Sequence, residues 1–114
     1  MTSPTEACII CTVISNRQFI ERTEHGVIFK PDNPIVEGHL IVAPLVHIEN
    51  GLLNPVITAQ VMRMAAMKAK EPCTIVLPVG EEAGQVHPHM YVHIVPAAAG
   101  QARFIKAGEV KARR

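Results

Sequence analysis

The sequence predicts an α+β fold in which an antiparallel sheet of about five strands packs against one main helix. Its 114 residues are enough for one domain with a buried core and too few for two. Short runs rich in Val, Ile and Thr alternate with clusters of Gly, Pro and Asn, a pattern typical of strands joined by turns. We therefore expect a single domain over residues 1–114, with flexible tails at 1–6 and about 107–114.

The strands are expected in chain order around a single helical segment. A short apolar segment at 8–16, with a tight turn at its Cys-x-x-Cys pair, comes first. Asn54 and Pro55 form a favourable helix start, and apolar residues at helical spacing continue to residue 70, before Pro72 stops the helix. The predicted strands cover residues 18–23, 26–30, 38–44, 73–79 and 86–96, with a further short run at 104–106.

Composition and charge restrict the partners and the compartment. The net charge of +1 does not indicate any class of binding partner. We interpret the basic C-terminal stretch 103–114 as a solvated tail rather than a nucleic-acid contact. The sequence has no apolar run of the roughly 18–20 residues that span a bilayer, and its first residues lack the basic patch and apolar core that we expect of a signal peptide. Three cysteines, two of them in a Cys-x-x-Cys pair, favour a reducing compartment. We expect a cytoplasmic protein that contacts no membrane.

Three of the six histidines lie within seven residues, in the stretch VHPHMYVHIVP at 86–96. Alternate side chains of an extended strand share a face, so one face would carry His87, His89, Tyr91 and His93. The apolar side chains at 90, 92 and 94 would point to the other face and bury in a core. Several polar rings on one face of a strand make a poor core and therefore indicate a functional site.

Other candidate residues allow a structural interpretation as well as a functional one. Cys8 and Cys11 could bind a metal ion or pack as two buried thiols. His47 follows a strand and could be a surface or capping residue. His39 is embedded in a predicted buried strand, so its ring needs a polar partner, which a histidine on the neighbouring strand would supply.

Two chemistries could use the histidines at 86–96. A His-x-His pair on a strand can chelate a metal, and with Cys8 and Cys11 two histidines would complete a tetrahedral zinc site. A neutral imidazole can instead attack phosphorus, while neighbouring imidazoles supply charge and proton transfer. The residue types by themselves do not choose between these chemistries.

In four motifs the sequence resembles the histidine triad (HIT) family of nucleotide hydrolases and transferases. The opening Cys-x-x-Cys matches Cys8 and Cys11, and a Pro-x-x-Gly-His run followed by Pro-x-x-His resembles IVEGHLIVAPLVH at 35–47. The Gly-x-x-x-Gly-Gln lead-in matches GEEAGQ at 80–85, and the family signature is similar to HMYVHIVP at 89–96. The resemblance covers about residues 7–96, in the right order, and implies a HIT-like sheet and a homodimer.

The resemblance also implies roles for individual residues. In the family the three signature histidines bind the α-phosphate, and the middle one attacks phosphorus. Tyr91 occupies that middle position here, and a phenol has a pKa of about 10 against about 6.5 for imidazole. His93 and His39 would bind phosphate and assist proton transfer. Gln85 and Asp32 would contact the nucleotide, although Asp32 lies one residue after the family's ribose-binding position.

Family patterns also suggest a second alignment of the signature. They suggest a set of metal ligands as well. His87-Pro88-His89 resembles the signature of the related galactose-1-phosphate uridylyltransferases, and in that alignment His89 would be the nucleophile. The spacing from Gly84 favours the first alignment, with His89 as the first triad histidine. In zinc-bearing HIT members the ligands correspond to two cysteines and two histidines. In this sequence they are Cys8, Cys11, His47 and His89.

The sequence therefore supports one main function and two alternatives. The first is a HIT-like protein that binds a purine nucleotide or nucleotide conjugate and cleaves a phosphoramidate or phosphoanhydride bond at the α-phosphate. The second is a catalytically impaired module with structural zinc that binds a nucleotide or a partner protein without turnover. The third is a zinc hydrolase with His87, His89 and His93 around an open metal, which leaves the cysteines unexplained.

Overall fold

The computed structural model describes residues 8–97, so the predicted tails at 1–6 and 107–114 and the run at 104–106 lie outside the described residues. The elements in chain order are α2 (Ile9–Ser15), β1 (Glu21–Arg22), β2 (Gly26–Phe29), β3 (Leu40–Pro44), α3 (Pro55–Lys68), β4 (Cys73–Val76), the 3₁₀ turn η1 (Glu81–Ala83) and β5 (Val92–Pro96). The strands form one sheet in the order β1-β2-β3-β5-β4, and each neighbouring pair is antiparallel. The predicted α+β class with a five-stranded antiparallel sheet is confirmed.

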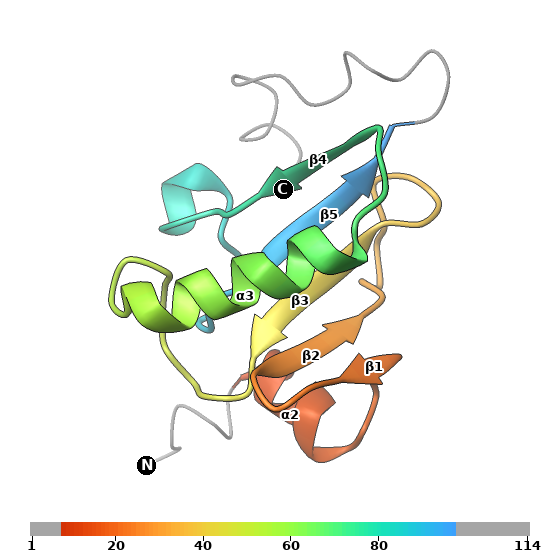
Figure 1. The fold of residues 1–114 in the computed structure, drawn as a ribbon. Coiled ribbons are helices and arrows are strands. Elements are labelled where there is room, and N and C mark those ends of the chain that lie inside the picture. The colour runs from red at the N-terminus through yellow and green to blue at the C-terminus, as the bar shows by residue number, and fades with distance from the viewer. Residues whose placement is uncertain (1–7, 98–114) are drawn as a thin grey trace.

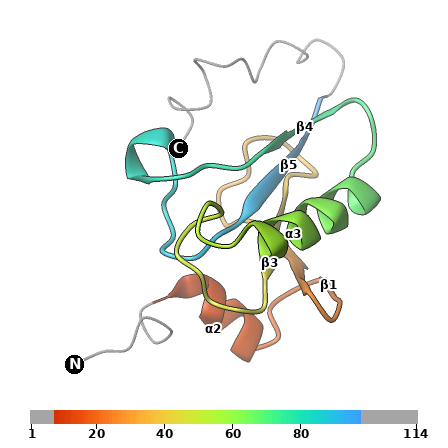
Figure 2. The same ribbon diagram turned by 60° about the vertical axis from the view of Figure 1, so that its left-hand side comes forward.

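The sheet separates two hydrophobic clusters, and a helix packs on each (Figures 1 and 2). On one face α3 buries side chains against the central strands, in a cluster of Ile28, Val42, Val61, Met64, Ala65, Met90, Val92 and Ile94. On the opposite face α2 covers a cluster of Cys8, Ile10, Val27, Phe29, Ile41, Ala43 and Tyr91. The predicted burial of the apolar side chains at 90, 92 and 94 is therefore confirmed, and Tyr91 faces α2.

The main helix has the predicted start and ends two residues early. Asn54 is the N-cap, and its side-chain oxygen accepts a hydrogen bond from the Ile57 amide at 3.1 Å. Pro55 takes the first helical position, where its missing N–H leaves no bond unmade. None of the helices between residues 8 and 97 combines the length and apolar character that crossing a membrane requires.

The strand predicted at 86–96 is wrong over its first six residues, because only Val92–Pro96 pairs with the sheet. Pro88 has no N–H to give to a ladder. The Val86 amide instead donates to the Tyr91 hydroxyl, and the Met90 amide donates to the Ile48 carbonyl. Residues 86–91 therefore form a loop before β5.

Other predicted boundaries also differ. The strands predicted at 26–30 and 38–44 are Gly26–Phe29 and Leu40–Pro44. The segment 8–16 contains helix α2 instead of only a tight turn, and Cys8 is its N-cap. The strand predicted at 73–79 ends at Val76. In the β4–β5 register, residues 78 and 79 would lie opposite residues 91 and 90 of the loop before β5, and Pro78 has no N–H for a ladder. The strand predicted at 18–23 shortens to Glu21–Arg22. In the β1–β2 register, residues 18 and 19 would lie opposite Pro31 and Lys30, which are beyond the end of β2 at Phe29.

Candidate metal centre and adjoining cavity

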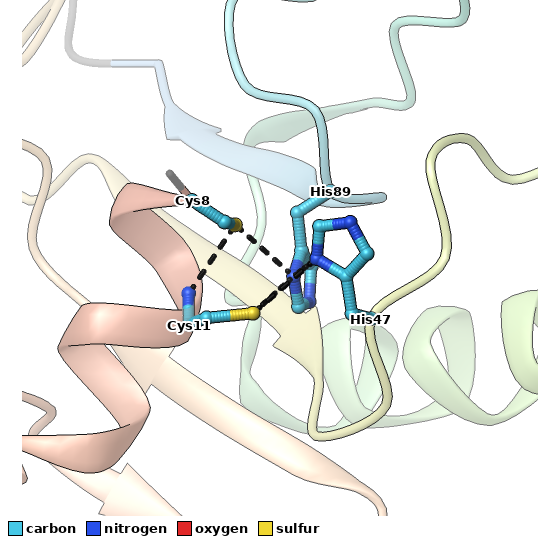
Figure 3. A group of neighbouring side chains, drawn as sticks. All are labelled: Cys8, Cys11, His47 and His89. Carbon is cyan, nitrogen blue, oxygen red and sulfur yellow. Dashed lines mark hydrogen bonds between the residues drawn. The ribbon is translucent and has the colours of Figure 1, made fainter. Parts of the chain in front are cut away.

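Four side chains from three separate segments converge into one cluster (Figure 3). Cys8 and Cys11 come from the start of α2, His47 from the loop after β3, and His89 from the loop before β5. One ligand atom from each residue lies within 4.8 Å of all the others. These are the four residues that the family resemblance suggested as zinc ligands.

A hydrogen bond at Nε2 determines which ring nitrogen of His89 carries the hydrogen. Nε2 lies 2.9 Å from the Pro44 carbonyl oxygen, which can only accept, so Nε2 carries the hydrogen and Nδ1 keeps a lone pair. Nδ1 in turn lies 3.5 Å from both cysteine sulfurs and 3.2 Å from His47 Nδ1. One lone pair cannot serve three donors, so hydrogen bonding does not account for this convergence.

A tetrahedral cation accounts for it better. Zinc bonds of about 2.3 Å to sulfur and about 2.0–2.1 Å to nitrogen would separate sulfur from nitrogen by about 3.5 Å and the two nitrogens by about 3.3 Å. Three sulfur–nitrogen distances in the cluster are 3.3–3.5 Å, and the nitrogen–nitrogen distance is 3.2 Å. The cluster therefore has both the donor types and the spacing of a closed tetrahedral metal site.

Burial sets the protonation of the cluster. It raises the pKa of the Cys11 thiol to about 11, and the adjacent Cys8 adds to this shift. It lowers the pKa of His89 to about 4, although the bond to the Pro44 carbonyl opposes the change. Cys11 therefore stays a thiol unless a cation lies beside it, while neutral His89 offers its lone pair. Metal binding would release the thiol proton.

A cavity of about 690 Å³ opens on the same face of the sheet as α2. Apolar side chains from α2 and the strands line part of it, among them Ile9, Val13, Phe29, Ile35 and Ile41. Three imidazoles and one phenol, from His39, His87, His93 and Tyr91, line another part. Lys30 and Asp32, both exposed, contribute charged groups at its edge.

A backbone amide determines which hydrogens the His39–His93 pair carries. The Ile35 N–H donates to His39 Nδ1 at 3.0 Å, so the His39 hydrogen is on Nε2. That hydrogen points to His93 Nδ1 at 2.8 Å, which leaves the His93 hydrogen on Nε2. Burial, with the nearby His39 and His87, lowers the pKa of His93 to about 4. The neutral pair therefore offers a hydrogen-bond donor, and its contacts give no support to the predicted proton transfer.

Tyr91 is inaccessible to solvent, with 0% of its surface exposed. Its hydroxyl oxygen accepts the Val86 amide hydrogen at 2.8 Å. Burial raises the pKa of this phenol, and hydrogen bonding to the backbone at Val86 and His87 opposes the change only in part. The ring lies between two imidazoles, with centroids 5.2 Å from His87 and 5.3 Å from His93. Tyr91 is therefore a neutral phenol at neutral pH.

The remaining predicted residues have different surroundings. Asp32 lines the cavity, as a nucleotide contact would require. Gln85 is not among the residues that line it. The Gln85 side chain accepts from the Gly80 amide and donates to the carbonyls of Glu49 and His87, so it links two loops. Only the open-metal alternative assigned a role to His87, and the backbone groups of Ile35 and Pro44 could not be recognised from the sequence.

These features define a class of protein: a sheet protein with a thiol–imidazole metal cluster and a histidine-lined cavity next to the same helix. The HIT domain model matches residues 14–100, more than half of the chain, and the protein belongs to the HIT family. That match begins after both cysteines of the cluster. The metal-site assignment therefore depends on the geometry of the cluster and not on the family match.

Known proteins of the histidine triad family are similar to this one over most of the chain. An uncharacterized HIT-like protein of Methanocaldococcus jannaschii is 29% identical over 91% of this chain and 89% of its own. The structure of a hypothetical histidine triad nucleotide-binding protein from Sulfolobus tokodaii aligns with a TM-score of 0.73 and 26% identity, over 82% and 70% of the two chains. A Zn-bound histidine triad family protein from Mycobacterium smegmatis aligns with a TM-score of 0.73 and 22% identity, over 95% and 90%.

Proposed function

We propose that this protein is a zinc-stabilised HIT protein that binds a purine nucleotide or nucleotide conjugate in the cavity, with the α-phosphate on His93. Tyr91 does not act as its nucleophile. The observation that carries this proposal is the contrast inside the triad segment. His89 belongs to the cysteine cluster, and His93 presents a hydrogen-bond donor to the cavity. Tyr91, which lies between these two residues in the sequence, is buried.

Zinc is the metal that the donor set favours. Two thiolates and two imidazoles at tetrahedral spacing are typical of structural zinc, and all four positions are taken by protein, so no site is left for substrate. Zinc here would hold the start of α2, the His47 loop and the loop before β5 together. The third alternative, an open hydrolytic zinc at His87, His89 and His93, is disfavoured because His89 lies among the cysteines.

Nucleotide binding is supported by the size and chemistry of the cavity. Its volume of about 690 Å³ is within the roughly 300–1,000 Å³ typical of small-molecule sites. Apolar side chains would pack on the base, and the exposed Asp32 carboxylate would accept from ribose hydroxyls. The His93 Nε2 hydrogen would bind a phosphate oxygen. The nucleotide-binding description of the Sulfolobus tokodaii relative points to the same ligand class.

The surroundings of Tyr91 argue against the predicted attack by this residue. A nucleophilic phenol must lose its hydrogen, and burial makes that loss harder. Its hydroxyl oxygen also accepts from the Val86 amide and takes part in the loop before β5. This hydrogen bond connects the two ends of the loop, at Val86 and at Tyr91 next to β5. The homodimer and the cytoplasmic location stay predictions from the sequence.

Calorimetric titration with adenosine monophosphate tests this function, with His93→Ala and His25→Ala as matched histidine variants. His25 is an exposed residue before β2 and does not line the cavity. We expect saturable binding to the parent and to His25→Ala, and at least a tenfold weaker affinity in His93→Ala. Equal affinities in all three proteins, or no binding to the parent, would contradict the proposed nucleotide site.

Elemental analysis tests the proposed metal. We expect one zinc per chain in the purified parent, and its loss when Cys8 and Cys11 are both changed to Ser. Cys73→Ser is the control, because Cys73 is the one cysteine of the chain outside the cluster. Zinc retained by the double variant would mean that a different ligand set binds it.

A further inference from the structure

His87 is the histidine of the cavity that has no role in the proposed function, because the open-metal alternative that used it is disfavoured. Its side chain is half-buried and lines the cavity together with His39 and His93. The Tyr91 ring lies between His87 and His93, at 5.2 Å and 5.3 Å from their ring centroids. The fully covered phenol thus has a partly exposed imidazole on each side, and both imidazoles border the space where a ligand would bind.

The backbone around His87 is held on both sides. Before it, the Val86 amide donates to the Tyr91 hydroxyl at 2.8 Å. At His87 itself, the carbonyl oxygen accepts from Gln85 Nε2 at 2.9 Å, while Gln85 Oε1 accepts from the Gly80 amide. Pro88 then fixes the next backbone angle. A loop residue outside the sheet ladder therefore has the fixed position that a reactive group needs.

We propose that His87 is the nucleophile that attacks the α-phosphorus of the bound nucleotide, and that Tyr91 and Gln85 are positioning residues for it. This rests on the proposed nucleotide site. His93, on the other side of the phenol, donates its Nε2 hydrogen to a phosphate oxygen and stabilises the charge that develops there. His87 therefore attacks phosphorus, and His93 stabilises the charge on the phosphate oxygen.

The reaction balances as a hydrolysis in two displacements. A ring nitrogen of His87 forms a bond to phosphorus while the bond from phosphorus to the leaving amine or phosphate breaks, and the leaving group takes a proton from solvent. Water then attacks the phosphorus, and the nitrogen–phosphorus bond breaks. One water proton returns to solvent, His87 is again neutral, and the product is the nucleoside monophosphate. No redox partner is needed, and no metal takes part in either step.

The test uses the zinc-loaded protein with adenosine 5′-phosphoramidate as substrate, and compares the parent with His87→Gln, Tyr91→Phe and His25→Ala. We expect His87→Gln to lose at least about 100-fold in kcat while its affinity for adenosine monophosphate stays within about threefold. Tyr91→Phe keeps the ring but loses the hydroxyl that holds Val86, so its kcat should fall about tenfold with unchanged affinity. His25→Ala should match the parent.

Trapping the covalent intermediate separates His87 from Tyr91 chemically. Substrate labelled in the adenosine is mixed with protein, the reaction is quenched, and the labelled peptide is mapped. A phosphorus–nitrogen bond to histidine is labile to acid, whereas a phosphorus–oxygen bond to tyrosine resists it. Acid-labile label on His87, still formed by Tyr91→Phe, supports the proposal. Label on Tyr91 or another histidine, or full turnover by His87→Gln, overturns it.

Failure of this proposal is distinguishable from failure of the proposed function. If the parent binds adenosine monophosphate but cleaves no phosphoramidate, His87 is not a nucleophile and the protein is a binding module. If Tyr91→His alone becomes active, with label on the new histidine, His87 is again excluded and the pocket has lost its nucleophile at position 91. If the parent does not bind the nucleotide, the proposed function itself is wrong.

Discussion

The candidate metal site and the cavity each contain a buried histidine, His89 in the first and His39 in the second. Hydrogen bonds to the backbone leave these two histidines with opposite properties. In the cluster the Pro44 carbonyl accepts the hydrogen of His89 Nε2, so a lone pair on Nδ1 faces the cysteines. In the cavity the Ile35 amide donates to His39, and the His39–His93 pair then presents a hydrogen at its far end. The backbone group bonded to one ring nitrogen therefore decides whether the imidazole offers a lone pair to a cation or a hydrogen to an anion.

The largest effect that this comparison predicts is on stability when the metal is removed. Chelation of the proposed zinc, or the Cys8→Ser change, should lower the free energy of unfolding by several kcal/mol, because metal binding is linked to folding. Urea unfolding followed by circular dichroism measures it, and Cys73→Ser is the control. An unchanged unfolding midpoint after complete chelation would mean that the cluster does not stabilise the fold.

A smaller effect is expected when the cavity pair is titrated. The pKa of His93 is lowered to about 4, below its usual 6.5, so the unfolded chain binds this proton more readily. The stability that neutral His93 contributes is complete above about pH 6.5 and is lost as the pH falls toward 4. Between pH 7 and 5 the parent should lose about 2 kcal/mol more than His93→Gln. His39 and His87 face His93 and are present in both proteins.

Parallel pH-dependence curves for the parent and His93→Gln would contradict the neutral pair. The measurement is urea unfolding at a series of pH values with zinc in excess. His25→Ala, which changes a histidine outside the cavity, should follow the parent.

The smallest effect concerns the backbone donor itself. Ile35→Pro removes the amide hydrogen that fixes His39, whereas Ile35→Ala keeps it. We expect affinity for adenosine monophosphate to fall about tenfold in Ile35→Pro and only a few fold in Ile35→Ala, since a charge-assisted hydrogen bond contributes on the order of 1.5 kcal/mol. Calorimetric titration compares them. Equal losses would mean that the Ile35 side chain matters and that its amide does not.

The fold and the metal ligands could be predicted to different depths from the sequence. Asn54 and Pro55 determine a helix start locally, so α3 was predicted to within two residues. The cluster required a motif resemblance, because Cys8 and His89 are far apart in the chain and spacing alone cannot bring them together. The structure places them side by side, as that resemblance implied.

The part that could not be predicted depends on contacts made by the backbone. An alternating pattern extended the last strand back to residue 86, but the Val86 amide bonds to the Tyr91 hydroxyl instead of to β4 or β3. The Ile35 amide and the Pro44 carbonyl are equally invisible in a sequence, since every residue except proline carries the same two groups. Their direction depends on the completed fold, and so does the state of each histidine.

The separation between Cys8 and His89 has a consequence for how the chain would acquire the proposed zinc ion. The two residues are 81 positions apart, so an ion bound to both closes a loop through most of the described chain. Before that loop closes, the newly made chain offers only a local pair of thiols at its beginning. Full affinity would therefore require His89, in the loop before β5, to lie beside Cys8 and Cys11 as it does in the folded chain. The zinc content of a sample should consequently indicate the fraction of completely folded chains. A chain truncated before His89 should bind zinc weakly.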